Sequence, residues 1–458
     1  MILAVLLIAA LCYAVLSSAV IPALPVFQRS LNASETGVTW LLTGFLLSAS
    51  VGTAIIGKLG DIHGKRPLLV GTLLVLAAGT ALAGLANSLA VLIVARVIQG
   101  VAGGIFPLSF SIIRDEFPKD RVPGSIGLMS AVLGIGGGFG LVVGGLIDEH
   151  LNWHWLFWIP LPVMLLGAVG ARLFIPPPRG RAPGQVNWTA AALMSIGLCC
   201  VLIAIAQTSV WGWTGTKTLA LLGFGLAVCA LWIAFELRSS NPLIDMALMR
   251  VRGVWTVNLA AFLLGGGLYS FFLLLPQLAQ LPASTGFGYG ASVVAAGLYL
   301  LPLAVGMGIL GALAGRIERR FSSRWALITG SAIGTVACIC LTLASRHPAG
   351  MLVSSALLGV GIGLAFSALG NLIVQAVPES QTGVASGMNN VLRTLGGALG
   401  GQIAATFVAG DLIRGLPALA GFTKTFAMAA LFLAGCCVAG TLIPVQDGVA
   451  PAWQPEAG

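Results

Sequence analysis

A lone carboxylate lies in a glycine-rich, basic segment between two long apolar stretches. Gly57, Asp61, Gly64, Lys65 and Arg66 follow the spacing Gly-x-x-x-Asp-x-x-Gly, with two basic residues after it. The glycines permit a tight turn between close-packed helices. The Asp61 carboxylate can accept hydrogen bonds from Lys65 or from a helix N-terminus, whose dipole favours a negative charge. We therefore expect a functional polar contact here, with a simple helix-capping aspartate as the alternative.

A damaged copy of this segment recurs in the second half of the chain, from Gly311 to Arg320. Both copies read as loops between apolar stretches. In the second copy Gly315 stands where the first has Asp61, so we expect Gly315→Asp to bring little benefit. Two similar halves with one asymmetric charge suggest a molecule that moves between two states.

Arg96 lies well inside an apolar stretch, in the pattern Leu92-x-x-x-Arg96-x-x-Gln99-Gly100. An arginine buried in a membrane span is costly and usually functional. The matched residue of the second half is Ala356, so the fold does not require a charge at this place. We expect Arg96, Gln99 and Gly100 to be functional, and Arg96→Ala to leave folding unharmed. The alternative is a side chain that snorkels to the membrane surface.

The acidic residues offer few sites for proton chemistry within the apolar stretches. All fourteen Asp and Glu residues fall in loops or at expected helix ends, and none lies near the middle of a stretch. Proton-driven membrane proteins usually use a titratable group in their pathway. The candidates are therefore rim acids, namely Asp148, Glu149 and Asp411 at one end of the molecule and Asp61 at the other.

The composition is that of a protein with many membrane spans. Of the 458 residues, 58% are hydrophobic and 8% are charged, whereas soluble domains carry about 25% charged residues. Apolar runs of about 20 residues, each long enough to cross a bilayer, recur throughout the chain. We expect fourteen transmembrane helices, at residues 3–25, 38–57, 68–87, 90–113, 123–146, 155–174, 187–207, 218–236, 254–278, 289–313, 325–344, 349–375, 384–409 and 423–443.

The distribution of basic residues indicates a membrane topology and argues against nucleic-acid binding, although the net charge is +9. Lys and Arg concentrate in alternate loops, on the side that holds the segment 57–66. This bias is the positive-inside rule, and it places both termini in the cytoplasm. All eight cysteines fall within expected helices, as apolar packing residues do. Five tryptophans crowd the opposite side, as interfacial anchors would: Trp153, Trp155, Trp158, Trp211 and Trp213.

The chain repeats itself as two halves with an inserted helix pair. Phe106 and Gly140 of the first half align with Phe366 and Gly400 of the second, among other matches. The distance between the copies exceeds a six-helix half by one helix pair, so the halves are related as parallel repeats. We expect an N-terminal six-helix bundle (1–176), an inserted helix pair with cytoplasmic linkers (177–252), a C-terminal six-helix bundle (253–443) and a cytoplasmic tail (444–458).

These motifs resemble those of the major facilitator superfamily of secondary transporters. The segment 57–66 resembles the family signature between helices 2 and 3, and the pattern around Arg96 resembles a second family motif. Helix 5 resembles the antiporter motif of exporters, Gly-x-x-x-Gly-Pro-x-x-Gly-Gly, with Leu141 in place of the proline. The matching glycines are Gly136, Gly140, Gly144 and Gly145.

The resemblance to one branch of this family covers the whole chain. The segments 152–160 and 384–393, together with the extra helix pair, are similar to the fourteen-helix drug:proton antiporter branch. One departure matters for energy coupling. That branch commonly has an aspartate early in helix 1, whereas the corresponding residues 16–25 contain no acid.

The resemblance implies an all-α membrane protein with the major facilitator fold, in the bacterial inner membrane, that works by alternating access. It implies a secondary active transporter that exports amphipathic drugs or secondary metabolites, driven by the proton gradient and without a cofactor. We expect a monomer whose partners are a small amphipathic organic substrate, protons and the lipid bilayer. In such a protein the motif around Asp61 is the cytoplasmic gate, and Arg96, Gln99, Gly100 and the rim acids serve transport or coupling.

Polar residues that could line a central substrate cavity are few. An apolar cavity with these groups suits amphipathic molecules that are neutral or anionic. Each group could instead form a hydrogen bond between helices. The candidates are Ser17, Ser18, Asn258, Tyr269, Gln277, Asn389, Asn390 and Arg393.

Two other functions stay open at this point. An uncoupled facilitator or a lipid-related carrier is possible because no acid lies in the middle of a span. A membrane scaffold or receptor that does not transport could use the same fold. We do not expect an enzyme, since the sequence has neither a cluster with metal-ligand spacing nor a phosphate-binding loop of the Walker type.

Overall fold

The computed structural model describes residues 1–177, 185–410, 412–413 and 416–444, and it is almost entirely helical. The first half of the chain forms α1 (Ile2–Ser30), α2 (Glu35–His63), α3 (Lys65–Gly84), α4 (Leu89–Gly100), the 3-10 turn η1 (Val101–Gly104), α5 (Ile105–Glu116), α6 (Val122–His150), α7 (Trp155–Trp158) and α8 (Pro160–Phe174). An inserted region follows, with α9 (Trp188–Ala206), α10 (Thr208–Trp211), α11 (Thr216–Glu236) and α12 (Met246–Arg250).

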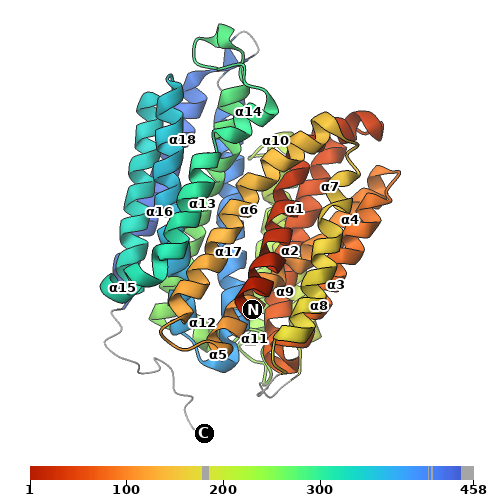
Figure 1. Ribbon diagram of the computed structural model, residues 1–458, viewed down its shortest axis with the longest axis vertical. Coiled ribbons are helices and arrows are strands. Elements are labelled where there is room, and N and C mark those ends of the chain that lie inside the picture. The colour runs from red at the N-terminus through yellow and green to blue at the C-terminus, as the bar shows by residue number, and fades with distance from the viewer. Residues whose placement is uncertain (178–184, 411, 414–415, 445–458) are drawn as a thin grey trace.

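The second half repeats the pattern of long helices. It contains α13 (Arg252–Gln280), η2 (Ala283–Thr285), α14 (Val293–Leu298), α15 (Leu301–Ala344), α16 (Pro348–Gln375), η3 (Glu379–Gln381), α17 (Thr382–Gly410), β1 (Leu412–Ile413), β2 (Leu416–Pro417) and α18 (Leu419–Leu442). Thirteen helical segments of the described chain are long and apolar enough to cross a membrane. The glycine-rich, partly polar α17 brings the number of long segments to fourteen, and its place is the centre of the molecule (Figure 1).

Two bundles stand side by side in Figure 1. Helices α1–α8 form one bundle and α13–α18 form the other, and α6 and α17 lie between their outer helices. The halves meet where α2 packs on α17 and where α6 packs on α15 and α16. The helix α9 contacts both α2 and α17, whereas α11 packs on α9 and is the least buried of the candidate spans. The inserted pair therefore lies against the junction of the two bundles.

The basic segments 57–66 and 311–320 are mainly helical, so the expectation that they form loops is wrong. Helix α2 continues to His63, and the chain turns at Gly64 alone, whose φ of 100° is unfavourable for residues with a side chain. In the second half α15 continues through the segment 311–320, and its turn is at Ser322, with φ 66°. The turn of the second half therefore lies beyond the segment that aligns with 57–66.

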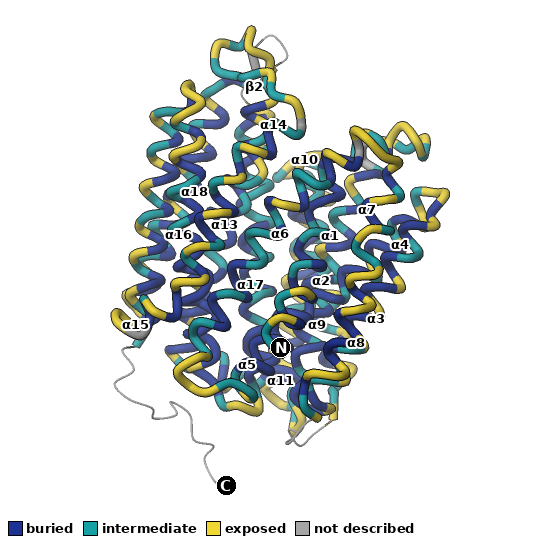
Figure 2. The backbone as a smooth tube through the Cα atoms, viewed as in Figure 1, coloured by how far each residue is buried: buried dark blue, intermediate teal, exposed yellow. Residues whose placement is uncertain are grey.

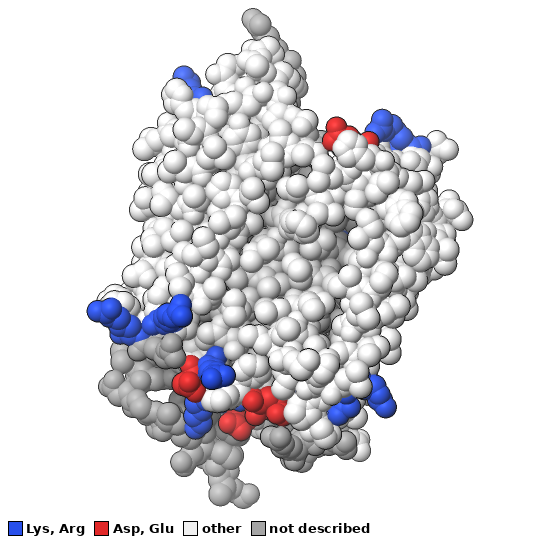
Figure 3. Space-filling model, viewed as in Figure 1, with Lys and Arg blue, Asp and Glu red and all other residues white. Residues whose placement is uncertain are grey.

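Burial follows the membrane environment of the helices. Buried residues run along the facing sides of both bundles in Figure 2, and α16 is the most buried candidate span. Many leucines and valines on α8 and α11 are exposed instead, as lipid-facing residues are. On the face shown in Figure 3 charged side chains occupy the two ends, and the broad band between them is uncharged. This band is the part of the molecule that fits the apolar core of a bilayer.

One of the five tryptophans expected at the membrane surface is in the core. Trp153 is buried and packs edge-on against Phe27 and Phe157, while its ring stacks on His154. Trp155 is 48% exposed, as an interfacial anchor would be. The interfacial prediction is therefore wrong for Trp153, because the segment after α6 folds back over the end of α1.

Candidate functional site

Asp61 joins the two halves of the molecule. Its carboxylate oxygens accept hydrogen bonds from the backbone N–H groups of Gly383, at 3.2 Å, and Val384, at 3.1 Å. Both groups belong to the first turn of α17, where the unpaired N–H groups and the helix dipole favour an anion. Asp61 is buried at this contact. The sequence offered Lys65 and a helix N-terminus as partners, and the structure shows the helix N-terminus.

The neighbours of Asp61 bring the backbones of α2 and α17 close together. A Cβ atom built on Gly57 would lie only 2.4 Å from the carbonyl oxygen of Gly383. Lys65 forms an ion pair with Asp115, and Arg66 donates to the carbonyl oxygen of Arg172. The five motif residues thus do three different things. Gly57 and Asp61 contact the other half, Lys65 and Arg66 brace their own half, and Gly64 forms the turn.

Arg114 is a further contact between the halves that the sequence did not single out. Its guanidinium donates to the carbonyl oxygen of Val377, at 2.9 Å, and to the hydroxyl of Thr382, at 2.7 Å. All hydrogen bonds that the structure describes between residues 1–176 and 253–443 lie between the Asp61 end and the middle of α17. We call this end of the molecule the closed end.

Arg96 is fully buried within the N-terminal bundle. It donates to the carbonyl oxygens of Leu16 and Leu41, at 3.2 Å each, and to the side-chain oxygen of Gln99, at 2.8 Å. Its guanidinium carbon also lies 4.1 Å from the centre of the Phe45 ring, within the range of a cation–π contact. The side chain therefore ties α4 to α1 and α2. The reading as a snorkelling arginine is wrong.

One nitrogen of Arg96 nevertheless stays without a partner. The Nη2 atom is buried and has no hydrogen bond in the described part of the chain. Tyr13, buried on α1, is within electrostatic reach of Arg96 and also of Arg393 and Tyr269 from the other half. The ring of Tyr13 stacks on Phe45 at 5.4 Å. Tyr13 was missed in the sequence, although it is one of only four tyrosines and lies inside a span.

Arg393 occupies a similar position on the C-terminal side. Its guanidinium carbon lies 4.1 Å from the centre of the Phe366 ring, and it donates to the side chain of Asn390. Asn390 in turn donates to the hydroxyl of Thr53 on α2, at 3.4 Å. Arg393 and Asn390 line a small cavity between α5, α16 and α17, of about 10 Å³. A space of this size holds one water molecule at most, so the centre is packed shut toward the closed end.

The other predicted cavity residues divide into four groups. Asn389 donates to the side chain of Asn258 at 3.0 Å, which makes this pair a contact between helices. Ser17 and Ser18 bond to carbonyl oxygens of their own helix α1, and Ser18 also lies 3.4 Å from the carbonyl oxygen of Gly136 on α6. Gln277 is exposed near the end of α13. Tyr269 is half-buried beside Gly397.

The glycines of helix 5 let α6 pack closely on α1. Cβ atoms built on Gly136, Gly140 and Gly144 would lie 2.1 to 2.5 Å from atoms of α1. Gly145 is buried in the same helix. This geometry provides close packing, which the sequence left as an alternative to a direct role in transport.

The rim acids are largely outside the described residues. Asp411 and the side chain of Asp148 lie outside them, and Glu149 is exposed at the end of α6. The acids at helix ends are not all at the surface, however. Asp61, Glu236 and Glu318 each end or nearly end a span and are buried. The burial of these three acids could not be predicted from their places at helix ends.

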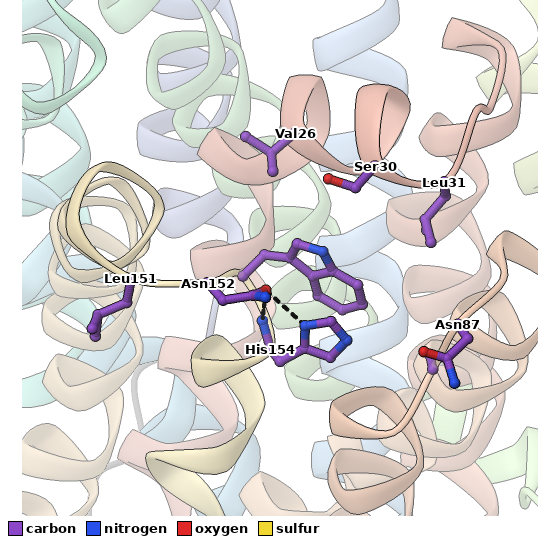
Figure 4. Close-up of a pocket in the computed structure, with 9 residues that line it drawn as sticks. Val26, Ser30, Leu31, Asn87, Leu151, Asn152 and His154 are labelled. Atoms are coloured by element: carbon purple, nitrogen blue, oxygen red, sulfur yellow. Dashed lines mark hydrogen bonds between the residues drawn. The ribbon is translucent and has the colours of Figure 1, made fainter.

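A cavity of about 460 Å³ lies at the end opposite Asp61 and within one half only. The end of α1, the turn before α4 and the segment after α6 line it (Figure 4). His154 Nδ1 and Asn152 Oδ1, 2.7 Å apart, form its polar edge. The cavity does not reach Arg96, Arg393 or Asp61, so it is separate from the contacts that join the halves.

We expect Asp61→Asn to leave the protein folded and to slow its change of state. The amide accepts hydrogen bonds more weakly than the carboxylate, so the closed end loses stability relative to an open form. A loss of about 1–2 kcal/mol changes a two-state ratio about 5- to 30-fold. The measurement is the turnover rate at equal surface expression, with Asp115→Asn as a control that removes a carboxylate only from the ion pair within one half. Wild-type rates for Asp61→Asn would contradict this role.

Comparison with known proteins agrees with the motifs and the fold. A model of the Major Facilitator Superfamily matches residues 6–401. The tetracenomycin C resistance and export protein of Streptomyces glaucescens is 30% identical, over 84% of this chain and 71% of its own. The cephamycin export protein CmcT of Amycolatopsis lactamdurans is 29% identical, over 93% and 89%. The multidrug transporter protein MdtP of Bacillus subtilis is 27% identical, over 79% and 67%.

Solved structures show the same fold at lower sequence identity. The crystal structure of the human organic anion transporter MFSD10 superposes with a TM-score of 0.67 and 16% identity, covering 97% of this chain and 99% of the other. The proton:xylose symporter XylE superposes with a TM-score of 0.68 and 14% identity, covering 97% and 95%. The expectation of an all-α membrane fold of two bundles plus two inserted helices is thus confirmed.

Proposed function

The chain belongs to the major facilitator superfamily, and we propose that it is a secondary active transporter that exports amphipathic drugs or secondary metabolites across the bacterial plasma membrane. The observation that carries this proposal is the similarity along most of the chain to proteins named for the export of tetracenomycin C, cephamycin and multiple drugs. The exported molecules differ, so the chemical class is proposed here and not an individual compound.

The contacts between the halves support a mechanism of alternating access. Asp61 and Arg114 hold the two halves together at the closed end through hydrogen bonds to the first turn of α17 and the residues before it. The positive-inside distribution of Lys and Arg supports placing this end in the cytoplasm. The structure then corresponds to a state that is shut toward the cytoplasm, and breaking these few polar contacts is the step that opens it.

Central side chains favour substrates that are largely apolar. Arg96 and Arg393 are the cations of this region, and each lies over a phenylalanine ring. Tyr13, Phe45 and Phe366 contribute aromatic surface. Such a region suits a neutral or anionic amphipathic molecule, since a cation would meet two positive charges. We propose that the transporter acts as a monomer without a cofactor, and that the proton gradient drives export.

The test of this proposal is drug accumulation in a sensitive bacterial strain with and without the gene. The compounds are ethidium, norfloxacin and tetracenomycin C, which differ in charge at neutral pH. We expect lower accumulation of at least one compound when the gene is expressed, and a return to the level of the control strain after a protonophore collapses the gradient. Export that resists the protonophore would indicate another energy source. Equal accumulation of all compounds in both strains would argue for a scaffold or receptor.

A further inference from the structure

Glu318 is a buried carboxyl group with a full set of neutral hydrogen-bond donors. It ends the first part of α15, just before the turn at Ser322. One oxygen accepts from the hydroxyl of Ser367, at 2.8 Å, and the other accepts from the amide of Asn371, at 2.9 Å, and from the hydroxyl of Ser323. Two of these donors belong to α16, so the carboxyl group joins α15 to α16.

The same donors face the other half of the molecule. The amide nitrogen of Asn371 also donates to the carbonyl oxygen of Pro123, at 3.2 Å, in the first turn of α6. A Cβ atom built on Gly127, one turn further along α6, would lie 2.8 Å from the hydroxyl oxygen of Ser367. The residues that donate to Glu318 therefore also form the contact between α6 and α16 at the closed end.

No cation neutralises Glu318 in the described part of the chain. Burial and its three side-chain hydrogen bonds are the interactions that act on it, and no charged group is among them. Helix α16 contains no charged residue. The charged side chains of the neighbouring elements either are exposed or bond to other groups. Arg121, Arg316 and Arg320 are exposed, and the side chain of Arg319 lies outside the described residues. Arg324 donates to carbonyl oxygens of α18, and Arg114 donates to Val377 and Thr382.

Asp61 differs from Glu318 in this respect. Asp61 accepts from two backbone N–H groups at a helix N-terminus and has Lys58 and Lys65 nearby, whereas the groups that act on Glu318 are uncharged. The surroundings of Glu318 are compatible with both the carboxylate and the neutral carboxylic acid. A hydroxyl group can donate to a carboxylate, and it can rotate to accept from a carboxylic acid. Ser323 and Ser367 can therefore serve either protonation state of Glu318.

We propose that Glu318 is a proton-binding site whose occupancy controls the closed end. In the charged state the carboxylate holds the Asn371 amide by a charge-assisted hydrogen bond, and the amide is thereby fixed against Pro123. Binding one proton from water converts the carboxylate to a neutral carboxylic acid and weakens this bond. The contact between α6 and α16 then loosens, and opening of the closed end becomes easier. No other bond is formed or broken in this step.

This inference deepens the proposed transport function, because it names the group through which protons act. It places the coupling carboxylate in the C-terminal half, in place of the rim acids. A proton that favours opening at the closed end, and a charged carboxylate that favours closure, would link proton movement to the direction of the cycle. The direction is fixed because protonation weakens the contact between α6 and α16, so that the protonated protein opens more easily at the closed end.

The test needs protons alone and no substrate. The sample is purified full-length protein in lipid nanodiscs. Hydrogen–deuterium exchange is measured from pH 5 to pH 9 in peptides that cover the first turns of α6 and α17, and it is corrected for the pH dependence of the intrinsic amide exchange rate. We expect exchange in wild-type protein to increase as the pH falls. Glu318→Gln mimics the neutral acid, so its exchange should stay at the low-pH level throughout. Glu236→Gln is the matched control, because Glu236 is also buried and bonded to neutral donors, Trp232 and two backbone N–H groups.

Ser367→Ala is the second variant, and it keeps the carboxyl group. It removes a hydrogen bond that is stronger to the carboxylate than to the neutral acid, so the midpoint of the pH response should move to higher pH by about one unit. A pH response of Glu318→Gln equal to that of wild type would overturn the proposal and point to Asp61. If Glu318→Gln does not fold, a pH midpoint in Ser367→Ala equal to that of wild type would likewise overturn the proposal. A failure of the wild-type gene to lower drug accumulation would instead contradict the export function and leave the exchange result standing.

Discussion

Replacing Arg96 by alanine should abolish export. The guanidinium of Arg96 is the only charged group that joins α4 to the carbonyl oxygens of α1 and α2 among the described residues, and it brings a positive charge near Tyr13 at the junction of the halves. Alanine removes that charge and all three hydrogen bonds. Lysine keeps a charge but loses the planar group that reaches two carbonyl oxygens and Gln99 together, so we expect little activity from Arg96→Lys as well. The measurement is drug efflux at equal membrane expression.

The structure changes the expected effect of this substitution on stability. An unpaired charge could be removed without harm, but Arg96 is bonded and fills the space between three helices. Truncating a large buried side chain to alanine costs about 2–5 kcal/mol, so the melting temperature in detergent should fall. Leu73→Ala is the control, since Leu73 is equally buried in the same bundle and carries no polar group. Full efflux by Arg96→Ala, or equal loss of efflux in Leu73→Ala, would show that Arg96 is only structural.

The helices could be predicted from the sequence because a membrane leaves the backbone little choice. Each span must satisfy its N–H and C=O groups within itself, so a long apolar run becomes a helix. The role of Asp61 as a contact point could also be anticipated, since a lone acid next to a glycine turn and two cations has few other uses. Its partner is 322 residues away, however, and the N-terminus of α17 could be named only as one possibility.

The residues that the sequence did not reveal owe their places to packing between distant segments. Glu318 stands at a helix end in the sequence, yet α6 and α16 cover it in the fold. The partners of Arg96 are backbone carbonyl oxygens, which no side-chain pattern marks. The turn at Ser322 was placed too early because the basic residues before it resemble the Asp61 segment, although the helix continues through them.

Placing a side chain on Gly57 should lock the molecule away from its closed state. A Cβ atom there would lie 2.4 Å from the Gly383 oxygen, and both partners are backbone, which cannot move aside as a flexible side chain can. Gly315 is in the same situation on the other side of the interface, because its Cβ atom would lie 2.4 Å from the Cα atom of Gly124. Gly315→Asp should therefore be harmful, since any side chain at this place separates α15 from α6.

Gly57→Val and Gly315→Val should each remove most export while the helices stay folded, because the overlap exists only when the closed end is shut. Overpacking costs about 1–3 kcal/mol, which corresponds to about a 5- to 150-fold shift toward open forms. Faster hydrogen exchange at the start of α17 would report the opening directly. Gly71→Val is the matched control, since Gly71 lies in a helix of the same bundle with nothing within 4 Å of its Cβ position. Normal export by both interface variants would mean that closure at this end is not part of the transport cycle.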